Sequence, residues 1–307
     1  MSSFPLYKKR DFGEYMSDTF QFFRKFWKNY LLNFITLNGA LLLILCLIYF
    51  FIFKDLFGQA LINPTASPSF FTDENAGVFA VLFTVGALIA IIFTVITTAY
   101  PIVYLRLVAS TDRETFTASE ILNEIKKHIG RIIIFGLLSI FTFIPLIMIF
   151  FILSAALVLL LVGIPLLILG MGAAITWINQ SLYVYLNEEV GYFKAMGAGW
   201  RTLFSKFWHI VGSSTLMIFI LYVISFVVSI IPYSIMMARL ITTGSGEPDM
   251  EGIMPLMVII YVINIIFSYI FSNLIYINQG LIYYSGKETE EHVQAFSEID
   301  TIGRNEE

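Results

Sequence analysis

The stretch WINQSLYVYL, residues 177–186, has a close counterpart in YINQGLIYY, residues 276–284. In both, an Asn-Gln pair stands shortly before tyrosines at the end of a strongly apolar segment, and the two pairs are 99 residues apart. A weaker copy precedes them, since VYL at 103–105 is repeated at 184–186. These similarities indicate that the chain repeats one membrane unit and that the polar pair marks where a unit leaves the bilayer.

The composition places the chain in a membrane. Of its 307 residues, 58% are hydrophobic and 13% are charged, and the mean hydropathy is +0.82. A water-soluble globular domain has about 25% charged residues, so this chain has too little polar surface to cover a soluble globule. The single cysteine, Cys46, lies in an apolar run, which predicts a packing role and rules out an intrachain disulfide.

Six segments are long and apolar enough to cross a bilayer, which requires about 20 residues. We place them at 31–53, 77–105, 132–161, 165–186, 210–238 and 253–284. The boundary between the third and fourth rests on Gly163-Ile164-Pro165, because glycine and proline end a helix and proline is tolerated in a first turn. Pro101 and Pro145 lie inside spans and are expected to kink them.

The charges predict the topology. The first thirty residues carry both signs of charge before a long apolar run, which is typical of a retained transmembrane helix and not of a cleaved signal peptide. Of 18 Lys and Arg residues, 16 fall on the side of the two termini, and only Lys54 and Arg239 lie in the opposite loops. The positive-inside rule therefore predicts a multi-pass membrane protein with both termini in the cytoplasm.

An amphipathic segment precedes each odd-numbered span. Residues 11–30, 117–131 and 191–209 place apolar side chains at helical spacing. Asp11 with Glu14, and Thr117 with Glu120, have the spacing of capping boxes. The first and third segments also share a local string, FRKFWK at 23–28 and FSKFWH at 204–209.

These segments are expected to lie flat at the cytoplasmic headgroup boundary, with aromatic side chains in the bilayer and lysines reaching phosphates. The alternative is that they extend the spans as cytoplasmic stalks. The expected interfacial anchors are Phe23, Lys25, Phe26, Trp27, Lys28, Lys126, Lys127, Trp200, Phe204, Lys206, Phe207 and Trp208.

The predicted fold is a single all-α membrane domain over residues 1–307. Its six transmembrane helices form three parallel hairpin repeats, at about 11–108, 116–187 and 190–286, each preceded by a cytoplasmic interfacial amphipathic helix. Residues 287–307 are expected to form a solvated cytoplasmic tail, or alternatively a fourth surface helix. The small residues in the strings 171–173 and 197–199 are expected to allow close helix packing.

The polar groups inside the spans are neutral, which disfavours a proton-coupled or voltage-sensing mechanism. Two interpretations are open: the groups bond helix to helix, or some of them form a polar vestibule for a lipid headgroup or small solute. The candidate vestibule residues are Asn179, Gln180, Tyr183, Asn278, Gln279 and Tyr283. Arg106, Arg131 and Arg239 fall at span ends, where they can extend to the headgroups.

The sequence contains little enzymatic chemistry. The three histidines, His128, His209 and His292, lie in predicted cytoplasmic segments without metal-ligand spacing. There is no nucleophile motif, phosphate loop or paired transmembrane carboxylate, and the net charge of −4 does not favour nucleic-acid binding. We therefore expect no catalytic residues, no metal, no cofactor and no nucleic-acid partner.

The opening RDFGEYMSDTFQFFRKFWKNYLLNFITLNGALLL (10–43), the segment FKAMGAGWRTLFSKFWHIVG (193–212) and the repeated INQ exits resemble a group of bacterial six-span integral proteins common in Bacteroidetes. The layout is similar to the membrane domain of some glycerophosphodiester phosphodiesterases and to YciC-like proteins, and this resemblance implies a location in the bacterial inner membrane. Members often carry the label of carotenoid-cleaving monooxygenase, which implies four histidines around iron. This chain has three histidines, so we do not expect the monooxygenase activity. We do not expect the phosphodiesterase activity either, because the soluble domain that carries it is absent.

The leading functional hypothesis is a non-enzymatic membrane scaffold or assembly subunit that docks membrane lipids and other membrane or cytoplasmic proteins. The resemblance implies a MoxR-type ATPase system as one such partner. The alternative hypothesis is a carrier or permease-like component for a lipid or amphiphilic solute.

Overall fold

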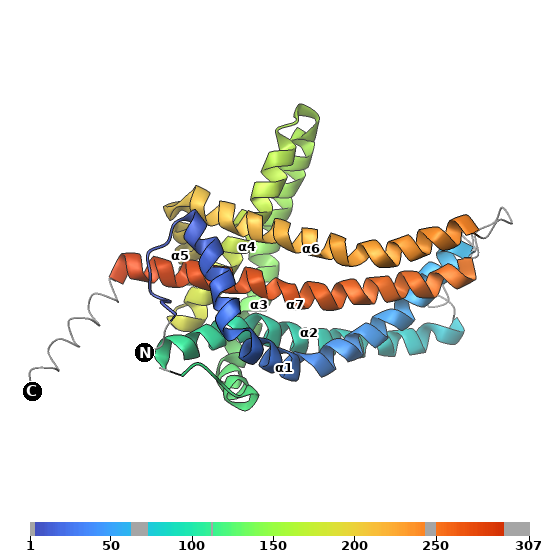
Figure 1. Ribbon diagram of the computed structural model, residues 1–307, viewed down its shortest axis with the longest axis horizontal. Coiled ribbons are helices and arrows are strands. Elements are labelled where there is room, and N and C mark those ends of the chain that lie inside the picture. The colour runs from blue at the N-terminus through green and yellow to red at the C-terminus, as the bar shows by residue number, and fades with distance from the viewer. Residues whose placement is uncertain (1–3, 63–72, 112, 243–249, 292–307) are drawn as a thin grey trace, which may run out of the picture. The chain divides into compact units, whose positions relative to one another are not determined.

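The computed structural model describes residues 4–62, 73–111, 113–242 and 250–291 (Figure 1). Over these ranges the regular secondary structure is helical, and six helices are long and apolar enough to cross a membrane. The helices are α1 (Phe12–Ile62), α2 (Asp73–Ser110), α3 (Ala118–Ala156), α4 (Gly163–Asn187), α5 (Tyr192–Ser205), α6 (Phe207–Thr242) and α7 (Met250–Glu291). The prediction of an all-α protein with six membrane-spanning segments is confirmed at this level.

Capping boxes begin two of the helices, as predicted. At the start of α1, the Glu14 N–H donates to Asp11 Oδ1 at 2.8 Å and the Asp11 N–H donates to Glu14 Oε2 at 3.0 Å. At the start of α3, Thr117 and Glu120 exchange the same two bonds at 3.3 and 2.8 Å. Each box satisfies N–H groups that a helix leaves unpaired in its first turn.

The break between the third and fourth spans falls close to the predicted position. α3 ends at Ala156, a 3₁₀ turn covers Leu157–Leu160, and α4 begins at Gly163. The backbone reverses at Leu161, whose φ of 59° lies in the left-handed region that glycine usually occupies. Pro145 lies inside α3, as Pro101 lies inside α2, and both helices continue through the proline.

The last span is longer than predicted. α7 continues to Glu291, whereas the sequence placed its end at 284, so the first residues of the expected tail are helical. Residues 292–307, including His292, lie outside the described part of the chain. The predicted opposite loops also fall partly outside it, at 63–72 and 243–249.

The amphipathic segments differ from one another in the structure. Before the first and third spans, the predicted surface segment is continuous with the span, in α1 and α3. Before the fifth span, α5 is a separate helix that ends at Ser205, and Lys206, with φ −142° and ψ 59°, interrupts it before α6. The prediction of a separate helix before every odd-numbered span is therefore wrong for the first and third spans, because the backbone stays helical from the amphipathic segment into the span.

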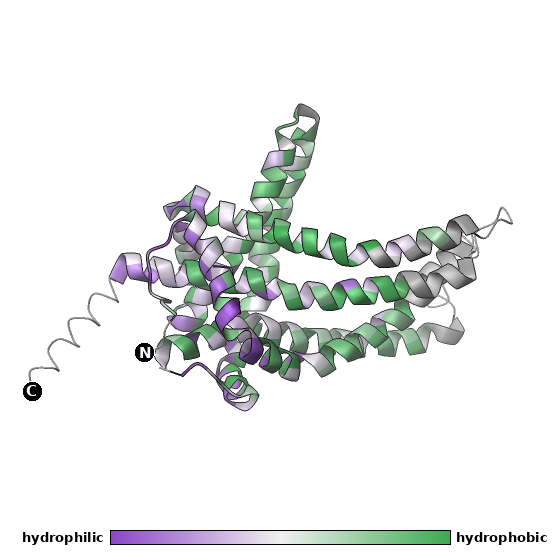
Figure 2. Cartoon of the chain, viewed as in Figure 1, coloured by the Kyte–Doolittle hydropathy of each residue, from purple (hydrophilic) through white to green (hydrophobic). Residues whose placement is uncertain are grey.

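The chain divides into two compact units, which are described separately. Among the described residues, the larger unit comprises 4–33, 98–111, 113–219 and 273–291, and the smaller unit comprises 34–62, 73–97, 220–242 and 250–272. α3, α4 and α5 belong entirely to the larger unit. Figure 2 shows hydrophobic residues along α3 and α4, and hydrophilic residues in the N-terminal segment and at the C-terminal end of α7.

In the larger unit, α4 packs against both α3 and α5 (Figure 1). The approach of α5 depends on Gly199, where a Cβ would lie 2.3 Å from Ser181 Oγ and 2.7 Å from Ser181 N. Trp177 Nε1 strengthens the contact by donating to Met196 O at 3.0 Å. Gly172 allows a close approach of α4 to α6, with a Cβ position 3.1 Å from Val211 O. Both small-residue strings thus serve close helix packing, as predicted.

In the smaller unit, Leu42, Leu45, Cys46 and Phe93 form a buried cluster, and Tyr269 of α7 packs its ring edge to face with Phe93 at 4.7 Å. The packing role predicted for Cys46 is confirmed, because its thiol is free and buried in this cluster. Polar side chains join helices here as well: Thr97 donates to Asn38 Oδ1 at 3.2 Å, and Ser229 donates to Asn264 Oδ1 at 2.8 Å.

Replacing Gly199 by alanine is expected to destabilise the protein, because the added methyl group overlaps the backbone of α4. Overpacking of this kind costs about 1–3 kcal/mol. Gly197→Ala is a matched control two residues away, where a Cβ meets nothing within 4 Å, and alanine there is expected to stabilise α5 by up to about 1 kcal/mol. Unfolding by dodecyl sulfate titration in mixed micelles measures both; equal midpoints for the two variants would contradict the tight α4–α5 contact.

Candidate functional site

The two predicted Asn-Gln pairs contribute to a buried polar network in the larger unit. Gln180 of α4 and Gln279 of α7 are both fully buried. Gln180 Nε2 donates to the Gln279 backbone carbonyl at 2.8 Å and to Gln279 Oε1 at 3.2 Å. The two glutamines that the sequence repeat identified are therefore in direct contact in the structure.

The network continues into α6. Gln279 Nε2 donates to Ser214 Oγ at 2.7 Å, and Ser214 Oγ lies 2.7 Å from Thr176 Oγ1 of α4. Ser214 also donates to the Ile210 carbonyl of its own helix at 2.9 Å. α4, α6 and α7 are thus joined through four fully buried polar side chains.

Asn278, next to Gln279, bonds in a different direction. Its Nδ2 donates to the Tyr15 carbonyl at 3.3 Å and to Thr19 Oγ1 at 3.2 Å, which connects α7 to α1. Two acceptors in the network, Gln180 Oε1 and Asn278 Oδ1, are buried without a hydrogen-bond partner among the described residues. Each such acceptor carries an uncompensated desolvation cost.

The other candidate vestibule residues lie around this network. Tyr183 donates to the Tyr276 carbonyl at 3.1 Å and stacks on Tyr283, with ring centroids 5.4 Å apart. Asn179 is half-buried and donates to the Ile175 carbonyl of its own helix at 2.8 Å. A shared vestibule of all six residues stays a prediction, and the bonds made by Gln180, Asn278 and Gln279 fit the alternative of helix-to-helix bonding.

A second buried group connects α1, α2 and α7. Tyr30 is fully buried and donates to Asn273 Oδ1 at 2.7 Å, and Tyr100 donates to the Tyr30 carbonyl at 2.6 Å. Tyr104 donates to Asn29 Oδ1 at 3.0 Å. Tyr104 belongs to the weaker sequence copy, VYL at 103–105, and in the structure its hydroxyl group and that of Tyr100 both join helices.

Arg106 and Arg131 do not simply extend outward, as the sequence suggested. Arg106 donates to Asn187 Oδ1 at 2.9 Å and to the Leu186 carbonyl at 2.7 Å. Arg131 donates to the Tyr185 carbonyl at 2.6 Å and covers the Tyr185 ring, 4.2 Å from its centroid. Both guanidinium groups therefore satisfy carbonyls that α4 leaves unpaired at its C-terminus.

Sequence reasoning missed Arg10, which it counted only as a positive charge. The side chain is fully buried; its Nε lies 2.9 Å from Asp18 Oδ2, and it donates to the Leu6 carbonyl at 2.8 Å and to the Pro5 carbonyl. Burial lowers the pKa of Arg10, and the Asp18 carboxylate opposes this shift. The Arg10 N–H donates to Ser285 Oγ at 3.0 Å, which holds the N-terminal segment on α7.

A polar cavity of about 380 Å³ lies beside this segment. Its walls come from the N-terminal segment and from the C-terminal ends of α2, α4 and α7. The lining residues are Tyr7, Arg106, Ala109, Ser110, Asn187, Glu188, Tyr283, Tyr284, Lys287 and Glu291. Lys287 lies 2.9 Å from Glu188 and 2.8 Å from Glu291, so the cavity wall contains paired charges beside tyrosine rings.

A larger apolar groove of about 540 Å³ is lined by α3, α4, α5 and α6. It contains four of the predicted anchors, Trp200, Phe204, Phe207 and Trp208, together with Trp177. Trp177 packs on Trp200 with ring centroids 4.8 Å apart, and Phe204 stacks on Phe207 at 5.6 Å. The aromatic side chains that the sequence assigned to the membrane surface thus form one continuous wall.

The remaining anchors are divided between surface and core. Trp27, Lys28, Lys126 and Lys127 are exposed, and Lys28 lies over the Trp27 ring. Phe26 is only 3% exposed and packs on Phe22, with ring centroids 4.9 Å apart. The expectation that Phe26 faces the headgroups is therefore corrected, because it packs inside the larger unit.

Phe23 and Lys25 are half-buried, and Lys25 pairs with Glu114 at 2.7 Å. Lys206 is exposed at the break between α5 and α6. These positions leave Lys206 and the exposed lysines of α1 and α3 as the anchors best placed to meet anionic groups.

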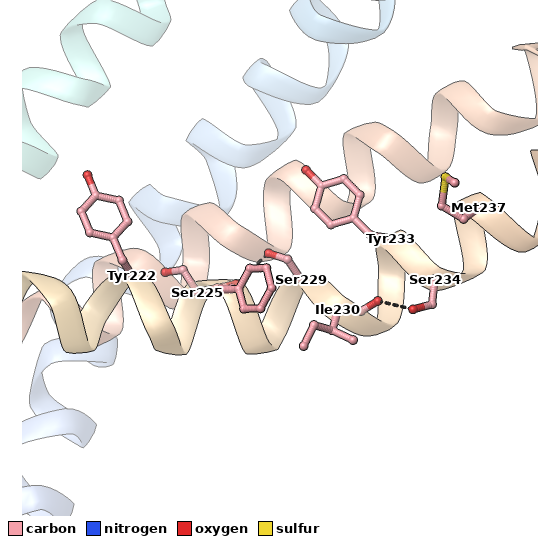
Figure 3. A pocket seen from close by; sticks show the side chains of 8 residues that line it. Tyr222, Ser225, Ser229, Ile230, Tyr233, Ser234 and Met237 are labelled. Carbon is pink, nitrogen blue, oxygen red and sulfur yellow. Dashed lines mark hydrogen bonds between the residues drawn. The ribbon is translucent and has the colours of Figure 1, made fainter. Parts of the chain in front are cut away.

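In the smaller unit, a surface groove of about 610 Å³ runs along α6 (Figure 3). Its lining comes from one helix. Ser234 donates to the Ile230 carbonyl of that helix at 2.7 Å, and the Ser229 hydroxyl lies 2.7 Å from the Ser225 carbonyl and 2.8 Å from Asn264 Oδ1 of α7. This groove is therefore an open helix face in which Ser229 and Ser234 already have hydrogen-bond partners.

Among the described residues, no three His, Cys, Asp or Glu side chains lie together in a way that could hold a metal ion. No protein-family model, characterised protein or solved structure matches the chain. The resemblance to bacterial six-span proteins therefore stays a prediction, and the function is argued from the residues of the chain.

Replacing Gln279 by methionine is expected to destabilise the protein by about 1–2 kcal/mol, because Gln180 loses the Oε1 acceptor, keeping only the backbone carbonyl, and Ser214 loses the Nε2 donor. Asn179→Leu is the matched control: that amide bonds only within its own helix, so the expected change is within about 0.5 kcal/mol. The same detergent unfolding assay compares the two. A larger loss at Asn179 than at Gln279 would show that the network does not hold the helices together.

Proposed function

We propose that the chain is a non-enzymatic scaffold, an assembly subunit of a larger complex in a bacterial inner membrane. The observation that carries this proposal is an ordered polar surface, which we call the platform. It consists of residues 4–10 and the C-terminal ends of α2, α4 and α7, joined by the bonds of Arg10 and Arg106.

The order of the platform suits it to docking. Residues near a chain terminus are usually poorly fixed, but here Tyr7 packs edge to face on Tyr284, with centroids 5.2 Å apart. Lys8 pairs with Glu14 at 2.9 Å, and this contact raises the pKa of Lys8. A partner that binds a pre-ordered surface pays a smaller entropic cost than one that must order it.

The distribution of basic residues supports a cytoplasmic position for the platform. It contains the N-terminal segment, and 16 of the 18 Lys and Arg residues lie on the side of the chain that includes both termini. By the positive-inside rule, this side faces the cytoplasm. The proposed partner is therefore a cytoplasmic protein or the cytoplasmic part of another membrane protein.

The proposal keeps the three parallel repeats, each entering and leaving on the cytoplasmic side. In support, Gln180 and Gln279 occupy corresponding positions of two repeats and bond to each other. Residues near an axis that relates two copies meet their counterparts in this way.

A photocrosslinking amino acid at Ser110 tests the scaffold. Ser110 is exposed on the platform, so irradiation of native membranes is expected to give a discrete protein adduct. Ser234, exposed on α6 of the smaller unit, is the control and should give lipid adducts only. If the Ser110 probe gives no protein adduct with the protein at its native level, the scaffold proposal is wrong.

Arg10→Met sharpens this test. Removing one partner of a buried ion pair costs about 3–5 kcal/mol, which should release the N-terminal segment and remove the Ser110 adduct. Lys9→Met changes the charge equally at an exposed neighbour and should leave the adduct in place. Hydrogen exchange of residues 4–10 confirms which variant has released the segment.

The polar cavity favours a second candidate function, a carrier for an amphiphilic solute. Its lining combines tyrosine rings with Arg106, Glu188 and Lys287, which suits a molecule with both polar and apolar parts. This function predicts a small molecule retained in native mass spectrometry and lost when Ala109→Trp fills the cavity. The scaffold predicts that Ala109→Trp perturbs the protein adduct at Ser110 without any such loss.

A further inference from the structure

α5 presents three distinct faces. Tyr192, Ala195, Gly199 and Leu203 are buried. Phe193, Trp200 and Phe204 share a second face and are 72%, 46% and 52% exposed. Lys194 and Arg201, seven residues apart and both exposed, lie beside that aromatic face. A helix with one buried, one apolar and one basic face is suited to the boundary between lipid and water.

The apolar groove extends from this helix along the membrane-spanning α4. Its α4 wall runs from Leu166 to Trp177, with lining residues at positions 166, 169, 170, 173, 174 and 177, which form a single helix face. At a rise of about 1.5 Å per residue this wall is about 16 Å long. One leaflet of a hydrocarbon core about 30 Å thick has nearly the same depth.

We propose that the groove holds one acyl chain of an anionic phospholipid, whose headgroup is bound by Arg201 and Lys206. The groove volume of about 540 Å³ lies within the range of about 300–1,000 Å³ that is typical of ligand sites. This site is independent of the scaffold function, because its residues belong to α3–α6 and the platform does not include them.

The charge of the headgroup follows from the basic side chains. α5 contains Lys194 and Arg201 and no acidic residue, and the exposed Lys206 stands between the groove residues Phe204 and Phe207. Long basic side chains reach from an apolar wall to phosphate groups. Trp200 and Trp208 at the same end of the groove are typical of the headgroup level.

The aromatic wall provides the reporter. Trp177 lines the groove and is half-buried, whereas Trp27 of α1 does not line it. In full-length protein carrying Trp27→Phe, Trp200→Phe and Trp208→Phe, Trp177 is the single tryptophan and the rings of the wall are conserved. The protein is placed in phosphatidylcholine vesicles that contain a small fraction of lipid with brominated acyl chains.

Brominated phosphatidylglycerol is expected to quench Trp177 with a relative binding constant about fivefold or more above that of brominated phosphatidylcholine, given the free energy of each basic contact to an anionic headgroup. Arg201→Gln with Lys206→Gln should remove this preference. Lys126→Gln with Lys127→Gln, an equal change of charge at exposed lysines of α3, should preserve it. Native mass spectrometry of the protein without tryptophan changes should show retained phosphatidylglycerol, lost in the first pair only.

Ala173→Phe is expected to fill the groove and abolish the quenching, whereas Ala155→Phe, exposed at the end of α3, should not. Equal quenching by both lipids, or quenching that survives both the charge change and Ala173→Phe, overturns the proposal. A lipid-free dimer in native mass spectrometry overturns it as well, because a second copy would then occupy the groove. The Ser110 adduct tests the scaffold proposal independently, so the failure of one proposal leaves the other in place.

Discussion

Hydrogen bonding in a low-dielectric interior is the constraint on which the larger unit depends. A polar side chain buried among membrane-spanning helices cannot exchange its bonds with water, so it must find a partner in the protein. The side-chain N–H groups of Gln180 and Gln279 meet this requirement, Gln180 at Gln279 and Gln279 at Ser214, and these bonds hold α4, α6 and α7 together. Asn278 adds α1 through its bonds to the Tyr15 carbonyl and Thr19.

The same requirement shapes the ends of the helices. The last carbonyls of α4 have no helical partner, and Arg106 and Arg131 supply one from α2 and α3. Arg10 satisfies the carbonyls of the N-terminal segment and pairs with Asp18. In the larger unit, the network and the platform are joined by polar bonds, while the groove lined by α3–α6 has walls that are almost entirely apolar. This separation underlies the two proposals, a protein-docking platform and a lipid-binding groove.

Much of the fold could be predicted because its signals are local. Apolar length gives the spans, the pairs Asp11–Glu14 and Thr117–Glu120 give helix starts, and Gly163-Ile164-Pro165 gives a helix break. The candidate site was predicted less completely. The Asn-Gln pairs could be found by repetition, but the burial of Arg10 and Phe26 could not. A basic or aromatic residue near a span end has the same sequence signal whether it faces lipid or packs inside.

The strings FRKFWK at 23–28 and FSKFWH at 204–209 show what the sequence determines and what the tertiary structure adds. The sequence by itself determined that both carry aromatic and basic side chains at helical spacing ahead of an apolar span. Only the tertiary structure decided that the first continues as α1 and that the second breaks at Lys206. Neither string contains proline or glycine. Ser205 and His209 are weaker helix formers than Arg24 and Lys28, but differences of this size do not by themselves break a helix. The second string breaks where α5 packs against α4, a contact that depends on Gly199 and on the hydrogen bond of Trp177.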